Sequence, residues 1–260
     1  MQNELKIALI QGHLVWENPI QNRINFSEKI SRIPKDVDLI ILPEMFTSGF
    51  TMNAEKIAET MDGETVTWLK QLAQKKLAAI TGSLVIKDQG VYFNRCFFVE
   101  PDGTISTYDK RHTFTLAGEH KVYQAGKTKT IITYKGWKIC PLVCYDLRFP
   151  VWARNTEGYD LLLYVANWPK VRINAWDVLL KARAIENMSY CIGVNRVGLD
   201  GNNYDYPGHS AAYDVLGHRM DRIPEAEEAI EIVVLDKGSI KKYREKLNFL
   251  NDRDNFNLTM

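Results

Sequence analysis

The stretch Trp137-Lys-Ile-Cys-Pro-Leu-Val-Cys-Tyr-Asp-Leu-Arg-Phe-Pro150 joins an apolar run to a short polar segment. Residues 137–143 are mostly apolar, which is typical of a buried β-strand, and the residues from Asp146 to Pro150 are typical of the start of a helix. Cys144 is therefore expected at a strand-to-helix junction, where backbone N–H groups and the positive end of a helix dipole favour a thiolate. This position makes Cys144 a candidate nucleophile, although cysteines that only fill a core are more common.

Composition limits the classes of protein that fit this chain. The 260 residues, of which 45% are hydrophobic and 25% charged, are enough for a large core. No composition break marks a linker, so we expect a single domain over residues 1–260, with 246–260 as a polar C-terminal tail. The net charge of +1 comes from interspersed charges, which argues against a nucleic-acid or membrane partner.

The N-terminus and the cysteines indicate a compartment. The first six residues lack the basic and apolar runs of a signal peptide, and no apolar stretch is long enough to cross a bilayer. The four cysteines show no CxxC spacing, which predicts reduced thiols rather than a disulfide framework. We therefore expect a cytoplasmic protein whose partners are small molecules or further copies of itself.

Hydrophobic periodicity predicts alternating strands and helices. The predicted strands cover residues 5–10, 38–43, 78–86, 91–100, 104–108, 128–134, 137–143, 160–166, 190–197, 210–214 and 229–235, and the predicted helices cover 19–33, 63–77 and 173–188, with a short one near Leu147. In the helix over 173–188, Arg183, Glu186 and Asn187 fall outside the apolar stripe. Two βαβ-type halves flanked by antiparallel strands favour an α/β fold, a four-layer αββα sandwich of two mixed β-sheets with outer helices.

Three reactive side chains follow predicted strands. Glu44 follows the run over 38–43, Lys110 follows Thr-Tyr-Asp, and Cys144 follows Pro-Leu-Val. Ligands of α/β sheets bind outside the carboxyl ends of strands. If these ends converge, the carboxylate takes the thiol proton, the thiolate attacks a carbonyl-like carbon, and the ammonium stabilises the oxyanion. When each residue is considered alone, a non-catalytic role explains it better than a catalytic one. Glu44 would cap a loop, and Lys110 would be a solvated loop cation.

Three short motifs resemble the catalytic signatures of the carbon-nitrogen hydrolase (nitrilase) superfamily and occur in the same order. They are Leu42-Pro-Glu-Met-Phe46, Tyr108-Asp-Lys-Arg-His112 and Cys144-Tyr-Asp-Leu-Arg-Phe-Pro150. The resemblance implies the αββα sandwich, a catalytic triad of Glu44, Lys110 and Cys144, no cofactor, and association into homodimers or larger homo-oligomers.

The same resemblance adds two candidates to the triad. Glu119, in Ala117-Gly-Glu-His120, resembles the second glutamate of the superfamily, which orients the lysine and the substrate nitrogen. The backbone N–H of Tyr145 is expected to be a further donor to the oxyanion.

Within the superfamily, three further segments most resemble bacterial omega-amidases: residues 114–120, 167–172 and 183–187. This resemblance implies hydrolysis of the terminal amide of 2-oxoglutaramate or 2-oxosuccinamate, through a cysteine thioester, to the acid and ammonia. These substrates carry an anionic end, so a cation is expected in the pocket.

Arg172 is the first candidate for that cation, because it lies just ahead of the predicted helix over 173–188. A surface salt bridge explains Arg172 equally well. Arg148 is the alternative, although its closeness to Asp146 indicates a structural ion pair. Phe114 and Trp168 are candidates for the pocket walls.

Other functions fit parts of the sequence. An N-carbamoyl-amine or aliphatic amide hydrolase of the same superfamily has the same chemistry, and an inert binding scaffold follows if Cys144 only fills a core. A metal site of His112, Glu119 and His120 lacks the spacing of a helical ligand set, so no metal is expected.

Overall fold

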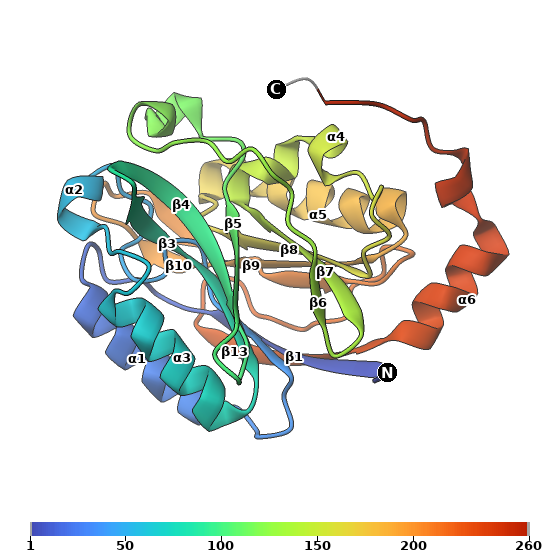
Figure 1. Cartoon of the computed structure of the whole chain (residues 1–260), viewed down its shortest axis with the longest axis horizontal. Helices are drawn as coiled ribbons and strands as arrows, with labels where there is room; N and C mark the ends of the chain where they lie inside the picture. Colours follow the sequence, from blue (N-terminus) through green and yellow to red (C-terminus); the bar gives the residue numbers. More distant parts are fainter. Residues whose placement is uncertain (1, 259–260) are drawn as a thin grey trace.

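The structure, a computed structural model, describes residues 2–258 and contains two mixed β-sheets that lie face to face (Figure 1). The first sheet has the spatial order β13 (Ala229–Asp236), β1 (Glu4–Gln11), β2 (Leu39–Ile41), β3 (Ala79–Asp88), β4 (Val91–Val99) and β5 (Ile105–Asp109). Strand β2 is parallel to both of its neighbours, and the outer pairs are antiparallel.

The second sheet has the order β12 (Ala211–Tyr213), β9 (Tyr190–Asn195), β8 (Leu161–Ala166), β7 (Trp137–Val143) and β6 (Ile132–Tyr134). Its three central strands, β7, β8 and β9, are parallel, so their carboxyl ends meet at one edge. A separate two-stranded ribbon of β10 (Val197–Leu199) and β11 (Asp205–Pro207) follows β9.

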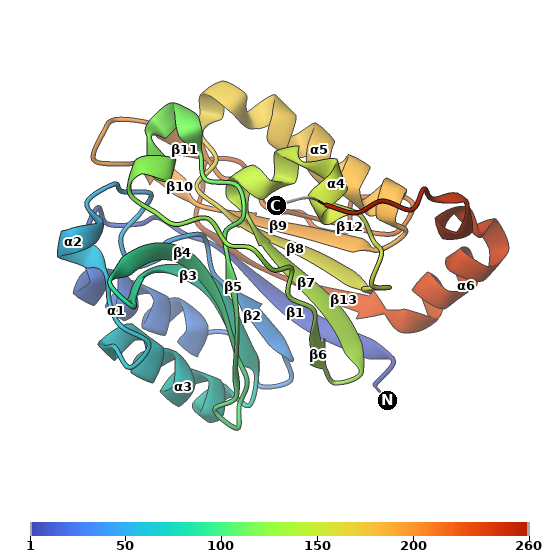
Figure 2. The ribbon, with the colours of Figure 1, turned by 45° about the horizontal axis from the view of Figure 1, so that its top comes forward.

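Helices cover the outer face of each sheet (Figures 1 and 2). Helices α1 (Pro19–Ser31) and α3 (Glu64–Lys76) lie on the first sheet, and α4 (Pro150–Ala153) and α5 (Ile173–Asn187) lie on the second. Strand β1 is buried on both faces: Ile7 and Leu9 belong to the core between the sheets, whereas Ala8 and Ile10 belong to the core under α1 and α3. The predicted four-layer αββα sandwich is confirmed.

Some local predictions were incomplete. Helix α2 (Ala54–Ile57), helix α6 (Lys237–Leu247) and strands β10 and β11 were not predicted, and β6 is shorter than the predicted strand over 128–134. Helix α6 is mainly polar, and its start is fixed by Asp236, whose side chain accepts hydrogen bonds from the N–H groups of Gly238 and Ser239. A 3₁₀ turn at Phe249–Asp252 follows it.

Within residues 2–258, no helix combines the length and apolar character needed to cross a membrane.

Helix α5 buries two polar side chains that lie off its apolar stripe. Arg183 and Asn187 fall outside the apolar stripe, yet both are buried. Arg183 Nη2 donates to the carbonyl oxygen of Leu147 at 2.7 Å, and Asn187 Oδ1 accepts from the Asn155 N–H at 2.9 Å. The segment after β7 covers this second face of the helix, so two polar side chains there are buried and hydrogen-bonded.

Candidate active site

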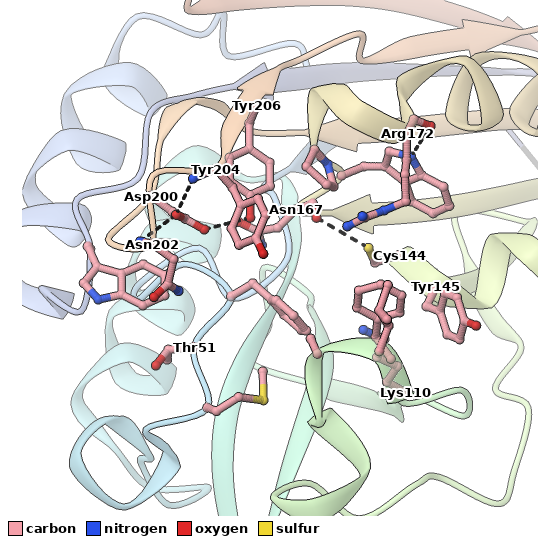
Figure 3. A pocket seen from close by; sticks show the side chains of 18 of the residues that line it. Thr51, Lys110, Cys144, Tyr145, Asn167, Arg172, Asp200, Asn202, Tyr204 and Tyr206 are labelled. Carbon is pink, nitrogen blue, oxygen red and sulfur yellow. Dashed lines mark hydrogen bonds between the residues drawn. The ribbon is translucent and has the colours of Figure 1, made fainter.

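A cavity of about 640 Å³ opens where strands of both sheets end (Figure 3). Lys110 follows β5 in the first sheet, and Cys144 and Asn167 follow β7 and β8 in the second. In Figure 3, Cys144, Lys110 and Arg172 lie at one end of the cavity, and Asp200 and Asn202 lie at the other. The convergence of these strand ends, expected from the apolar runs, brings the candidate nucleophile and the candidate cation into one cavity.

Glu44 and Lys110 form an ion pair that also includes Glu119. Lys110 Nζ lies 2.9 Å from Glu44 Oε1 and 3.0 Å from Glu119 Oε2. All three side chains are buried, with at most 1% of any residue exposed. The Phe114 N–H donates to Glu119 Oε2 and ties the loop that carries Glu119 to this cluster. The structure thus brings together all three charged residues named as catalytic candidates.

Asn94 in β4 completes this group, and the sequence analysis missed it. Its Nδ2 donates to Glu44 Oε1 at 2.8 Å and to Glu119 Oε1 at 3.3 Å. We call Glu44, Asn94, Lys110 and Glu119 the buried charge cluster. The signal in the sequence is a lone amide side chain inside a predicted strand, where asparagine is otherwise disfavoured.

Asn167 links the buried charge cluster to the second sheet. Its backbone N–H donates to Glu44 Oε2 at 2.8 Å, and its Nδ2 donates to the Glu44 carbonyl oxygen at 2.6 Å. Cys144 Sγ lies 3.8 Å from the Asn167 carbonyl oxygen. Asn167 therefore contacts both the carboxylate and the thiol.

Cys144 begins a 3₁₀ turn, Cys144–Arg148, with a left-handed backbone conformation at φ +45°. Such a conformation is costly for a residue with a side chain and recurs at functional turns. Burial raises the pKa of the Cys144 thiol well above its ordinary value, and the charge of Glu44 adds to this effect while Lys110 opposes it. Burial and the charge of Glu44 therefore oppose the thiolate that the strand-to-helix junction was expected to favour, which suits the expected transfer of the thiol proton to a base.

The charges of the cluster also shift one another. Burial lowers the pKa of Lys110, but the charges of Glu119 and Glu44 outweigh this effect and hold the pKa above its ordinary value. Burial raises the pKa of Glu119, and Lys110 only partly offsets that rise. Lys110 is therefore an ammonium at neutral pH.

Asp146 holds the segments on either side of the cluster. Its carboxylate accepts from Tyr108 Oη at 2.8 Å, from the His112 N–H at 2.9 Å and from the Val143 N–H at 3.0 Å. These bonds join the ends of β5 and β7, which carry Lys110 and Cys144. Asp146 does not pair with Arg148, so the expected structural ion pair was wrong.

Arg148 and Arg172, which we call the arginine pair, line the cavity near Cys144 and lie on aromatic rings. Arg148 Cζ is 4.9 Å from the centre of the Trp168 ring, and Arg172 Cζ is 5.2 Å from the centre of the Phe114 ring. Within residues 2–258, neither guanidinium lies within 4.0 Å of a carboxylate. The salt-bridge alternative for Arg172 was therefore wrong, and Phe114 and Trp168 do line the cavity.

Tyr145 contributes its ring to the same wall. The ring centre lies 4.9 Å from that of Phe114 and 5.1 Å from that of Phe149. Tyr145 therefore packs beside the ring that carries Arg172.

The candidates for a metal site do not share one location. His112 Nδ1 lies 2.8 Å from Asp146 Oδ1, Glu119 binds Lys110, and His120 is exposed. Among the residues that the structure describes, no three His, Cys, Asp or Glu side chains are arranged to hold a metal ion.

Comparisons with known proteins cover almost the whole chain. Residues 6–245 match the family model described as carbon-nitrogen hydrolase. The chain is 45% identical to "Omega-amidase YafV" of Escherichia coli (strain K12), over 98% of each protein. It is 30% identical to "2-oxoglutaramate amidase" of Bacillus subtilis (strain 168), over 95% of the chain and 96% of that protein.

A solved structure has the same fold. It is a CN-hydrolase superfamily protein of Xanthomonas campestris with an arsenic adduct in its active site. That protein is 42% identical, the alignment covers 99% of this chain and 100% of the other, and the TM-score is 0.97.

Proposed function

The chain belongs to the carbon-nitrogen hydrolase family, and from this premise we propose that it is an omega-amidase. It hydrolyses the terminal amide of a small 2-oxo dicarboxylic acid monoamide, such as 2-oxoglutaramate or 2-oxosuccinamate, to the acid and ammonia. The observation that carries this proposal is the cavity that joins Cys144 to the arginine pair. The omega-amidase and 2-oxoglutaramate amidase relatives support the same substrate class.

Acylation begins with the protonated thiol. Glu44 accepts the proton of Cys144 while the sulfur attacks the amide carbon, and the ammonium of Lys110 and the Tyr145 N–H stabilise the oxyanion. Glu44 then gives that proton to the leaving nitrogen. Ammonia departs, and the acyl group remains on Cys144 as a thioester.

Deacylation uses the same carboxylate again. Glu44 accepts a proton from water, whose oxygen attacks the thioester carbon, and the proton then returns to the departing sulfur. Glu119 holds Lys110 through two oxygens, at 3.1 and 3.0 Å, and so keeps the ammonium aimed at the oxyanion in both steps. Its position beside Lys110 also suits the role of orienting the substrate nitrogen.

Substrate choice depends on the arginine pair. A carboxylate entering a partly dehydrated cavity needs a cation with hydrogen-bond donors, and a guanidinium offers a planar fork for it. The two guanidiniums lie over the rings of Trp168 and Phe114, which provide no hydrogen-bond acceptor oxygen, so their N–H groups suit an anionic ligand. The two alternative functions explain less of the site. A neutral amide or an N-carbamoyl-amine as substrate gives the arginine pair no anion to bind. An inert binding scaffold gives the buried charge cluster no role.

The test is to replace Arg172 by Met and compare two substrates. For 2-oxosuccinamate, kcat/KM should fall by about 30-fold or more, because truncating one partner of a charge pair costs at least about 2 kcal/mol. A neutral amide of similar length should change little, and Arg172→Lys should lie between wild type and Arg172→Met. Ammonia release from both substrates gives the ratio of the two kcat/KM values.

The matched control is Lys170→Met in the same turn. Lys170 is exposed, pairs with Asp205 at 3.1 Å, and does not line the cavity, so the ratio should stay at the wild-type value. A ratio that is unchanged in both Arg172→Met and Arg148→Met contradicts recognition of an anionic substrate by the arginine pair.

We also propose a cytoplasmic homodimer or larger homo-oligomer, built from a single domain with residues 246–260 as a tail. The four cysteines are free, which suits a reducing compartment. Val171, Val178 and Ile185, in and beside α5, are at least 45% exposed, which suits contact with a second copy. Sedimentation analysis of the purified protein tests the oligomeric state.

A further inference from the structure

Asn94 contacts all three charged members of the buried charge cluster. Its side-chain amide donates to Glu44 and Glu119, and its backbone carbonyl oxygen accepts from the Lys110 N–H at 3.0 Å. The residue is 1% exposed and does not line the cavity. Asn94 therefore acts on the cluster without touching a ligand in the cavity.

The orientation of this amide follows from charge. Asn94 Oδ1 is buried and has no hydrogen-bond partner within the described residues, whereas Nδ2 has two. The reversed orientation would direct a carbonyl oxygen at two carboxylates and leave a buried NH₂ group unpaired. The NH₂ group must therefore face Glu44 and Glu119.

Hydrogen-bond counting distinguishes the two oxygens of Glu44. Oε1 accepts from Lys110 Nζ and from Asn94 Nδ2, which occupies both of its in-plane lone pairs. Among the residues that the structure describes, the Asn167 N–H is the hydrogen-bond donor to Oε2, which leaves one lone pair. Asn167 also contacts Cys144, so this free lone pair lies on the thiol side of the carboxylate.

We propose that Asn94 is a positioning residue that holds the Glu44 carboxylate in place and reserves its Oε2 for the proton of Cys144. The amide suits this task because it donates to both glutamates and brings no charge of its own into the cluster. The titratable groups that face Glu44 are Lys110, Glu119, Cys144 and Tyr123. The inference rests on the proposed role of Glu44 as the base, but not on the identity of the substrate.

The experiment measures pH profiles in wild type, Asn94→Leu and Asn94→Asp. Leucine has a similar size and removes both donors, so the ionised form of Glu44 loses support and the acid limb of kcat/KM should move to higher pH by about one to two units. Asn94→Asp should move the acid limb in the same direction. An ionised aspartate repels the two glutamates, and a protonated aspartate donates one hydrogen bond where the amide donates two. At the alkaline plateau, KM should stay within about twofold, since Asn94 does not line the cavity.

The rate of Cys144 alkylation by iodoacetamide gives a second profile that needs no substrate. Its acid limb should move together with that of kcat/KM. If wild type released no ammonia from 2-oxosuccinamate while both Asn94 variants moved the alkylation limb, the proposed substrate would be wrong and the role of Asn94 would stand.

Asn155 supplies the matched control. It is also a buried asparagine, but it bonds Tyr159 and Asn187 rather than the cluster. Asn155→Leu should lower stability without moving either acid limb. Two results would overturn the proposal. In one, the acid limbs stay in place in both Asn94 variants. In the other, the acid limbs of Asn155→Leu move as far as those of the Asn94 variants.

Discussion

The buried charge cluster and the arginine pair meet at the same end of one cavity, yet they are held in opposite ways. In the cluster, Lys110 lies within 3.1 Å of two carboxylates, and its side chain is 1% exposed. In the arginine pair, Arg148 and Arg172 are half-buried, rest on aromatic faces, and pair with no carboxylate within residues 2–258. The cation of the first region already has carboxylate partners without a ligand, whereas the two cations of the second region do not.

This difference separates two tasks. Groups that move protons and stabilise an oxyanion must already be oriented when the substrate arrives, so they are fixed by one another. Groups that select an anionic substrate must keep free donors, because a resident carboxylate would compete with it. Substitutions in the cluster should therefore lower kcat, whereas substitutions in the arginine pair should raise KM.

The largest expected effect is that of Cys144→Ala, which removes the nucleophile and leaves both regions in place. Turnover should fall by more than about 10⁴-fold, since loss of a nucleophile removes the covalent pathway. Cys140→Ala is the control: it creates a small cavity beside the buried strand β7, away from the cavity that holds Cys144, and should lower stability only. Ammonia release and thermal unfolding of both variants provide the comparison, and near-normal turnover in Cys144→Ala would exclude it as the nucleophile.

The next effect is that of Glu44→Gln, which should lower kcat by about 10³- to 10⁴-fold because a neutral amide cannot accept the thiol proton or activate water. Since the pKa of Cys144 is raised, alkylation by iodoacetamide near neutral pH should slow in the same variant. Unchanged alkylation would mean that the thiol ionises without Glu44, and the base would then be sought at Glu119.

Lys110→Met should lower kcat by about 10²- to 10³-fold, through loss of an oxyanion donor. It also leaves Glu44 and Glu119 buried without a cation, so the free energy of unfolding should drop by about 3 kcal/mol at neutral pH. The pKa of Glu119, already raised, should rise further. The folded variant then binds protons more tightly than the unfolded chain, and its stability should fall as pH rises above about 5. Urea unfolding at several pH values checks this slope against wild type.

The smallest effect is that of Arg148→Met. We expect KM for 2-oxosuccinamate to rise by about tenfold with kcat little changed, because Arg148 is half-buried and Arg172 remains. The double variant Arg148→Met/Arg172→Met measures the coupling between the two cations. A large drop in kcat without a change in KM would contradict the division of tasks between the two regions.

The sequence predicted those parts of the site that depend on local signals. Glu44, Lys110 and Cys144 each follow an apolar run or a turn-bounded strand, and the end of such a run is visible without knowing the fold. The three motifs then identified the family. The same local signals predicted most of the strands, and the four-layer sandwich followed from the βαβ pattern together with the family resemblance.

The missed features depend on contacts between distant segments. Asn94 and Asn167 are ordinary strand and loop residues in sequence, and their importance comes from Glu44, which lies 50 and 123 positions away. Arg183 and Asn187 look solvent-facing because helical periodicity describes one face only, whereas the segment after β7 covers a second. The raised pKa of Cys144 likewise follows from burial and from Glu44, neither of which a strand-to-helix junction reveals.

The origin of the site in two sheets has a consequence for folding. Glu44, Asn94 and Lys110 come from the first sheet, and Cys144 and Asn167 come from the second. Neither half of the chain holds both a nucleophile and its base, so catalysis begins only when the two sheets dock. The turnover rate therefore reports how accurately the two sheets are docked. A substitution that shifts one sheet slightly against the other should abolish turnover before it measurably lowers the melting temperature.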